Sequence, residues 1–204
     1  MMALTDSETP PPACENYRHW TMTDKDRVVS TVGDLLTTSD GDHTRPIILT
    51  MRDPVERLES EYGFIKYRVG LRRIWARQTG QMYPARLCDY CDHEATHNPI
   101  TKFLAGRDLF DAQPVPHSTL RTILNNLEAR TTIVTMHEDM GTSIARIERA
   151  MGIDLTLPTR RMMRTQYKPR RGANWEHVLH KVHQHHALDL ELYAWASRAF
   201  NKAG

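Results

Sequence analysis

The sequence predicts an α/β fold that is rich in helix, and two short apolar runs carry this prediction. The runs Ile47–Thr50 and Thr131–Thr135 contain many β-branched residues and are bounded by polar ones, as buried strands are. Each run is followed by a segment whose apolar residues repeat at three and four residues, as on one face of a helix. With 204 residues, of which 40% are hydrophobic, the chain is long enough to bury a core.

The N-terminal part predicts a tail followed by a helix. Residues 1–15 are polar and proline-rich, so we expect a disordered tail, and residues 16–204 are expected to form a single domain. Thr23 and Asp26 resemble an acidic capping box, and the valines and leucines that follow at helical spacing predict a helix over about residues 24–37.

The stretch 46–70 predicts a strand, a sharp turn and a helix. Asp53 is a favourable N-cap, Pro54 fits the first helical position, and Glu56 completes the pattern of a capping box. Arg52 then lies at the carboxyl end of the strand, beside the positive end of the helix. Ligands of open α/β sheets bind at this edge and anions favour helix N-termini, so Arg52 is a candidate anion-binding residue.

Further along, the sequence predicts more helices and a basic segment. The segment Leu71–Arg77 is expected to prolong the helix as a solvated basic face around a core tryptophan, Trp75. The alternative is a surface for an anionic acceptor, with Trp75 stacked on a sugar ring. Asn98, Ser118 and Asn174 are the expected N-caps of later helices. Four histidines near the C-terminus share no helical face and are expected to be mostly exposed: His180, His183, His185 and His186.

A cluster of cysteine and histidine residues offers an alternative organisation. The ligand types and local spacing of Cys88, Cys91, His93 and His97 are compatible with zinc, although the pattern is not that of the usual finger. Our first expectation is no metal, and a redox-active cysteine pair is a weaker alternative still.

Composition limits the cellular setting and the partners. The net charge of +2 gives no strong nucleic-acid or membrane signal, and no apolar run is long enough for a transmembrane helix. The N-terminal residues do not form a signal peptide. We expect a cytoplasmic protein as written, or a Golgi or membrane-associated one if an N-terminal segment precedes this sequence.

One motif resembles that of a known enzyme family. Residues 52–62, RDPVERLESEY, match the form R-[DE]-P-x-x-R-x-x-S-x-[YF], which resembles the 3′-phosphate-binding motif of sulfotransferases. These enzymes use 3′-phosphoadenosine 5′-phosphosulfate (PAPS), and the likeness is greatest to the carbohydrate (Golgi-type) branch and its small microbial relatives. The resemblance implies that Arg52 and Ser60 bind the 3′-phosphate of this co-substrate. Residues 98–106 also match an N-x-x-x-x-F-L-x-G segment of the same family.

A basic stretch adds a second, fainter resemblance. The segment Thr159–Arg171 is the most basic of the chain. Arg170, Arg171 and Gly172, followed by Trp175, resemble the R-K-G-x-x-G-D-W nucleotide loop of cytosolic sulfotransferases, although the second glycine and the aspartate are missing. The resemblance implies that these three residues contact the nucleotide.

The resemblance covers roughly residues 45–204 and implies a P-loop-like α/β fold with a small central parallel sheet flanked by helices. The loop that holds the 5′-phosphosulfate in the family has no counterpart, so the chain is expected to be N-terminally incomplete or a diverged, weakly active form. The implied activity is sulfuryl transfer from PAPS to a hydroxyl of a carbohydrate-like acceptor. His19 is the candidate catalytic base. The alternative is a non-catalytic homologue that binds a nucleotide or polyanion.

Overall fold

The computed structural model describes residues 36–37, 46–155, 171–172 and 174–202. Of the predicted helix over 24–37, only Leu36 and Thr37 are described, and both are helical. The described elements follow in the order β1 (Ile47–Met51), α2 (Pro54–Lys66), α3 (Val69–Thr79), α4 (Leu87–Asp92), the 3₁₀ helix η2 (Glu94–Thr96), α5 (Pro99–Leu104), α6 (His117–Glu128), β2 (Thr132–Met136), the 3₁₀ helix η3 (His137–Asp139), α7 (Met140–Met151), α8 (Trp175–His185) and α9 (Ala187–Lys202).

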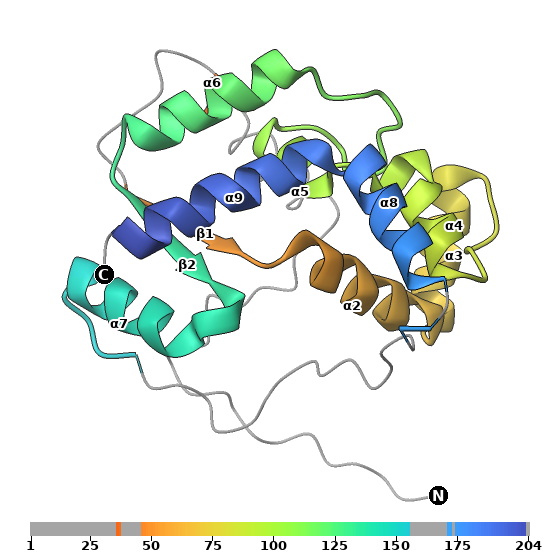
Figure 1. The fold of residues 1–204 in the computed structure, drawn as a ribbon, viewed down its shortest axis with the longest axis horizontal. Coiled ribbons are helices and arrows are strands. Elements are labelled where there is room, and N and C mark those ends of the chain that lie inside the picture. Colours follow the sequence, from red (N-terminus) through yellow and green to blue (C-terminus); the bar gives the residue numbers. More distant parts are fainter. Residues whose placement is uncertain (1–35, 38–45, 156–170, 173, 203–204) are drawn as a thin grey trace, which may run out of the picture.

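The two predicted strands form a parallel pair within the described part of the chain. Ile47 pairs with Thr132, and the register continues to Met51 and Met136. Helix α9 runs across the strands, and α7 lies beside β2 (Figure 1). The fold is therefore α/β and helix-rich with a small parallel sheet, as the sequence predicts.

Two hydrophobic cores hold these elements. The sheet core is aliphatic apart from Phe200 and contains Leu36, Leu49, Met51, Leu104, Val115, Leu120, Ile123, Leu127, Val134, Met136, Leu188, Leu192, Ala196 and Phe200. The aromatic core lies among α2, α3, α4 and α8 and contains Leu58, Tyr62, Trp75, Leu87, Tyr90, Cys91, Ala95, Val178 and Val182, with Tyr83 and Phe110 packed against it. No helix in the described ranges combines the length and apolar character needed to cross a bilayer.

The basic segment does not prolong α2, contrary to the sequence prediction. Helix α2 ends at Lys66, and Arg68 adopts an extended backbone conformation before α3 begins at Val69. This break redirects the chain so that Trp75 enters the aromatic core, where its side chain is only 2% exposed. The prediction of a core tryptophan is confirmed, and stacking of Trp75 on a sugar ring is excluded by its burial.

The predicted N-caps need correction. Helix α6 begins two residues earlier than expected, after Pro116, so Ser118 lies inside its first turn. Asn174 occupies the N-cap position of α8 but makes no capping hydrogen bond with its side chain. Asn98 precedes α5 in the left-handed conformation, with φ of 46°, and its side chain does not cap α5 either.

Asn98 and Asp189 instead cap each other's helices. The Asn98 side-chain oxygen accepts from the amides of Leu188 and Asp189 at the start of α9, at 3.0 and 3.1 Å. In return, the Asp189 carboxylate accepts from the amides of Ile100 and Thr101 at the start of α5, at 3.2 and 2.8 Å. Each side chain satisfies amides that lack a partner within their own helix. We call this arrangement the reciprocal clasp.

Candidate functional site

The carboxyl ends of the two strands bring two turns together. Since Met51 pairs with Met136 in a parallel register, the turn after β1 and the 3₁₀ helix η3 after β2 lie side by side. The backbone amide of Asp53 donates a hydrogen bond of 2.6 Å to the Glu138 carboxylate, which joins these turns directly. This edge is where ligands of parallel α/β sheets bind.

The turn after β1 starts α2 as the sequence predicts, with one difference. The Asp53 carboxylate accepts from the amides of Val55 and Glu56 at 2.9 and 3.0 Å, so the predicted N-cap is confirmed. The capping box is not closed, because the Asp53 amide is bound by Glu138 rather than by Glu56. Glu138 therefore links two turns, and its neighbour Asp139 caps α7 through the Thr142 amide.

Arg52 lies at this edge, and one N–H of its guanidinium has no hydrogen-bond partner among the described residues. Its side chain is 23% exposed, and its terminal nitrogen is 3.7 Å from a carboxylate oxygen of Glu56. Within the described residues, the buried Arg52 Nε–H makes no hydrogen bond. A buried guanidinium N–H without a partner is costly, and a bound anion would satisfy it.

The structure brings Arg171 onto α2, the helix that carries Ser60. The Arg171 guanidinium binds the carboxylate of Glu59, which is only 3% exposed, with nitrogen–oxygen distances of 2.9 and 3.4 Å. It also lies over the Trp175 ring, 4.7 Å from the ring centre. Ser60, which is half-buried, follows Glu59 in α2. Residues 112 positions apart in sequence are thus neighbours in space, and two of the predicted nucleotide-binding residues lie on or against one helix.

The other predicted site residues are less informative. Gly172 is exposed, and its carbonyl accepts from the Trp175 amide at 2.9 Å. His19 and Arg170 lie outside the described residues.

Negative charge also gathers at this edge. Asp53 caps α2 and Glu56 lies in its first turn, and both raise the pKa of Arg171 beyond the effect of Glu59, its principal partner. Burial, followed by the charges of Glu138 and Asp53, raises the pKa of Tyr193 on α9. An incoming phosphate must therefore compete with carboxylates for the arginines. The proximity of Tyr193 to this edge had no signal in the local sequence.

The cysteine and histidine residues do not converge on a metal site. Burial raises the pKa of the Cys91 thiol to about 12, so this thiol is protonated at neutral pH in the metal-free chain. The His93 ring accepts from the Ala95 amide and packs on Trp75, while the His97 ring stacks on His185. Among the described residues, no three His, Cys, Asp or Glu side chains are placed to hold a metal ion.

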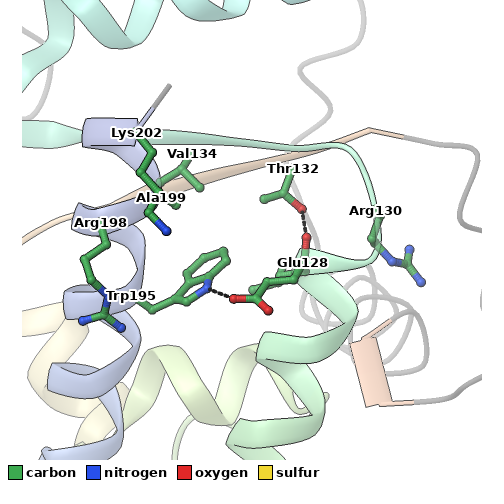
Figure 2. A pocket seen from close by; sticks show the side chains of 9 residues that line it. Glu128, Arg130, Thr132, Val134, Trp195, Arg198, Ala199 and Lys202 are labelled. Carbon is green, nitrogen blue, oxygen red and sulfur yellow. Dashed lines mark hydrogen bonds between the residues drawn. The ribbon is translucent and has the colours of Figure 1, made fainter. Parts of the chain in front are cut away.

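A pocket of about 340 Å³ lies at the opposite end of the sheet. It is lined by Thr132 at the start of β2, by Arg130, and by Trp195 and other α9 residues (Figure 2). The Trp195 indole N–H donates to Glu128 at 2.8 Å along its wall. None of the predicted site residues lines this pocket, so it is separate from the edge that carries Arg52.

Comparison of the chain with protein-family models, with curated proteins and with solved structures gave no match.

Proposed function

We propose that this chain is a homologue of PAPS-dependent sulfotransferases, in which Arg52 and Ser60 bind the 3′-phosphate of the nucleotide. The observation that supports this most directly is the buried Arg52 Nε–H without a hydrogen-bond partner among the described residues. It lies beside a strand end and a helix N-terminus, where an anion is stabilised by backbone amides and the helix dipole.

The wider arrangement supports the same assignment. In this proposal β1 and β2 belong to the central sheet of a P-loop-like sulfotransferase fold, and their parallel pairing is what such a sheet requires. Arg171 and Gly172, which shortly precede α8, cover the nucleotide; Arg170, the third residue of this assignment, lies outside the described residues. Glu59 holds Arg171 against α2 until the nucleotide binds.

PAPS supplies an activated sulfuryl group, which passes to a carbohydrate-like hydroxyl. A sulfur–oxygen bond to the acceptor forms as the bond to the leaving phosphate breaks, which requires in-line geometry. The acceptor's proton passes to a base, and His19 remains the candidate for this role. The chain's own contribution at the described edge is to position the nucleotide through its 3′-phosphate.

A second candidate is a binding protein without catalysis, which keeps the same 3′-phosphate site. The sequence favours this candidate because the loop that holds the 5′-phosphosulfate has no counterpart: Lys25 is the only lysine before Lys66, and no glycine-rich turn precedes Arg52. Positive charge on the leaving phosphate is a large part of catalysis in such transfers.

Calorimetric titration with adenosine 3′,5′-bisphosphate tests the nucleotide site. We expect the wild-type chain to bind and Arg52→Ala to bind at least roughly tenfold more weakly, as for loss of a charge-assisted hydrogen bond. Arg121→Ala, an exposed arginine on α6, is the matched control and should bind as wild type does. Failure of the folded wild type to bind would refute both candidates. If it binds, turnover of labelled PAPS over a panel of sugar acceptors separates the enzyme from the binding protein.

A further inference from the structure

The surface around α3 combines cationic and apolar side chains. We define the α3 surface as Tyr67–Met82, a segment without a single aspartate or glutamate. Its four arginines are Arg68, Arg72, Arg73 and Arg77. Its large apolar side chains are unusually exposed: Tyr67 61%, Val69 55%, Ile74 43% and Met82 89%. Large exposed apolar groups that cluster in this way mark an interaction surface.

The helical spacing places both kinds of side chain on the outward face of α3. Trp75 is the residue that α3 buries. Arg73 and Arg77 lie two residues to either side of it, about 200° around the helix. Val69 precedes Arg73 by four residues and so lies on the same side of the helix. Ile74 lies on the adjacent side. The face opposite Trp75 is therefore both basic and apolar.

The arginines of this face have no carboxylate partners among the residues that the structure describes. In the part of the chain that the structure describes, Arg72, Arg73 and Arg77 form no ion pair, and Arg68 packs on the Phe64 ring at 3.8 Å. By contrast, Arg57 and Arg171 each bind a glutamate. Within the described ranges, the positive charge of the α3 surface is thus not compensated by carboxylates.

We propose that the α3 surface binds an anionic lipid bilayer, with α3 lying in the plane of the headgroups. Basic residues are attracted to anionic lipid headgroups, and exposed apolar side chains enter the boundary between headgroups and acyl chains. A soluble polyanion would use the arginines, but it offers no apolar layer for Val69, Ile74 and Met82. The combination of both kinds of side chain is what favours the bilayer.

This surface and the Arg52 site can operate together. Arg52 precedes α2 and α3 follows it, so the two are separated by the length of a 13-residue helix, about 20 Å. Figure 1 shows α3 beyond the far end of α2 from the strands. A bilayer beneath α3 leaves the edge of the sheet open, and lipid binding does not depend on the nucleotide assignment.

Co-sedimentation of the whole chain with vesicles tests this inference. We expect binding to vesicles of phosphatidylcholine with phosphatidylglycerol, little binding to phosphatidylcholine alone, and a decrease as salt is raised. The double variant Arg73→Gln, Arg77→Gln should lower partitioning roughly 10- to 30-fold. The variant Ile74→Ser, Met82→Ser should lower it roughly tenfold while leaving the charge unchanged.

The control is the double variant Arg121→Gln, Arg149→Gln, which replaces two exposed arginines on α6 and α7. We expect this variant to partition as wild type does. Three results would overturn the inference: absence of binding of the folded chain to the anionic vesicles, an equal loss in the control variant, or no loss in the Ile74, Met82 variant. In the last case the surface would be a polyanion site, and heparin should bind it without lipid.

Discussion

The two cores of this molecule are built in different ways. The sheet core joins strands and helices that are distant in sequence, and its side chains are almost all aliphatic. The aromatic core is mostly local, since Tyr62, Trp75, Tyr83, Tyr90 and Phe110 fall within one stretch of the chain. Buried aliphatic side chains need only apolar neighbours, whereas buried tyrosine hydroxyls also need hydrogen-bond partners.

For Tyr62 and Tyr83, the aromatic core meets this need through the backbone. The Tyr62 hydroxyl donates to the Ala85 carbonyl, and the Tyr83 hydroxyl donates to the Tyr62 carbonyl at 3.0 Å. These bonds fix the irregular segment between α3 and α4, which has no regular secondary structure to hold it. The sheet core is thus specified by the pattern of apolar residues in the sequence, whereas the aromatic core is specified by individual contacts. The following predictions test this difference.

Replacing Trp75 should have the largest effect. Trp75→Ala removes a ring that contacts Tyr83, Tyr90 and Phe110, and it should lower the free energy of unfolding by about 3–5 kcal/mol. Urea unfolding followed by near-ultraviolet and far-ultraviolet circular dichroism measures this. Ile74→Ala, on the exposed side of α3, is the control and should change stability by less than about 1 kcal/mol. If the two spectral transitions of Trp75→Ala separate, the cores unfold as independent units.

The reciprocal clasp should be the next most sensitive feature, because it connects the cores. Asp189→Ala leaves the amides of Ile100 and Thr101 without partners, and we expect a loss of about 2–4 kcal/mol. Asn98→Gly keeps the left-handed backbone without strain but removes the cap of α9, so it should lose about 1–2 kcal/mol. Chemical denaturation of both variants checks the order. A smaller loss for Asp189→Ala than for Asn98→Gly would contradict this view of the clasp.

Part of this architecture follows from short-range patterns in the sequence, and part of it has no local signal in the sequence. The strands, the Asp53 cap and the place of Arg52 follow from patterns within a few residues, and the structure agrees with them. The clasp does not, because the local rule assigns Asn98 to its own helix while the actual partner is about ninety residues away. The pair of Arg171 with Glu59 is equally non-local. The sequence predicts that His186 is mostly exposed, but it is fully buried, since the turn between α8 and α9 places it against Cys91 of α4 and near Arg57 of α2.

Acid should weaken the junction of the cores through its histidines. Burial lowers the pKa of His97 from 6.5 to about 4, and burial with the charge of Arg57 lowers that of His186 to about 3. Between pH 6.5 and about 4 the unfolded chain therefore binds protons that the folded chain does not, so stability falls as the pH falls. His97→Gln should reduce this loss by about 1–2 kcal/mol.

Denaturant titrations across this pH range, with His180→Gln as the exposed control, provide the measurement. Asp189 acts in the opposite sense, because burial raises its pKa and the folded chain gains a proton there in acid. The comparison of wild type with His97→Gln cancels that contribution. An identical pH dependence in the two proteins would mean that the Asp92 carbonyl and the charge of Glu94 accommodate a charged His97 despite repulsion from His185 and Lys102.

The smallest effect is expected at the exposed margin of the sheet core. Trp195 donates to Glu128 along the wall of the pocket, in a bond that water can replace (Figure 2). Glu128→Gln keeps an acceptor for the indole and removes only the charge, so the change in unfolding free energy should be at most about 0.5–1 kcal/mol. Unfolding monitored by tryptophan fluorescence measures it. A loss as large as that of Trp75→Ala would show that a single polar contact also holds the sheet core, and the distinction between pattern and individual contact would then fail.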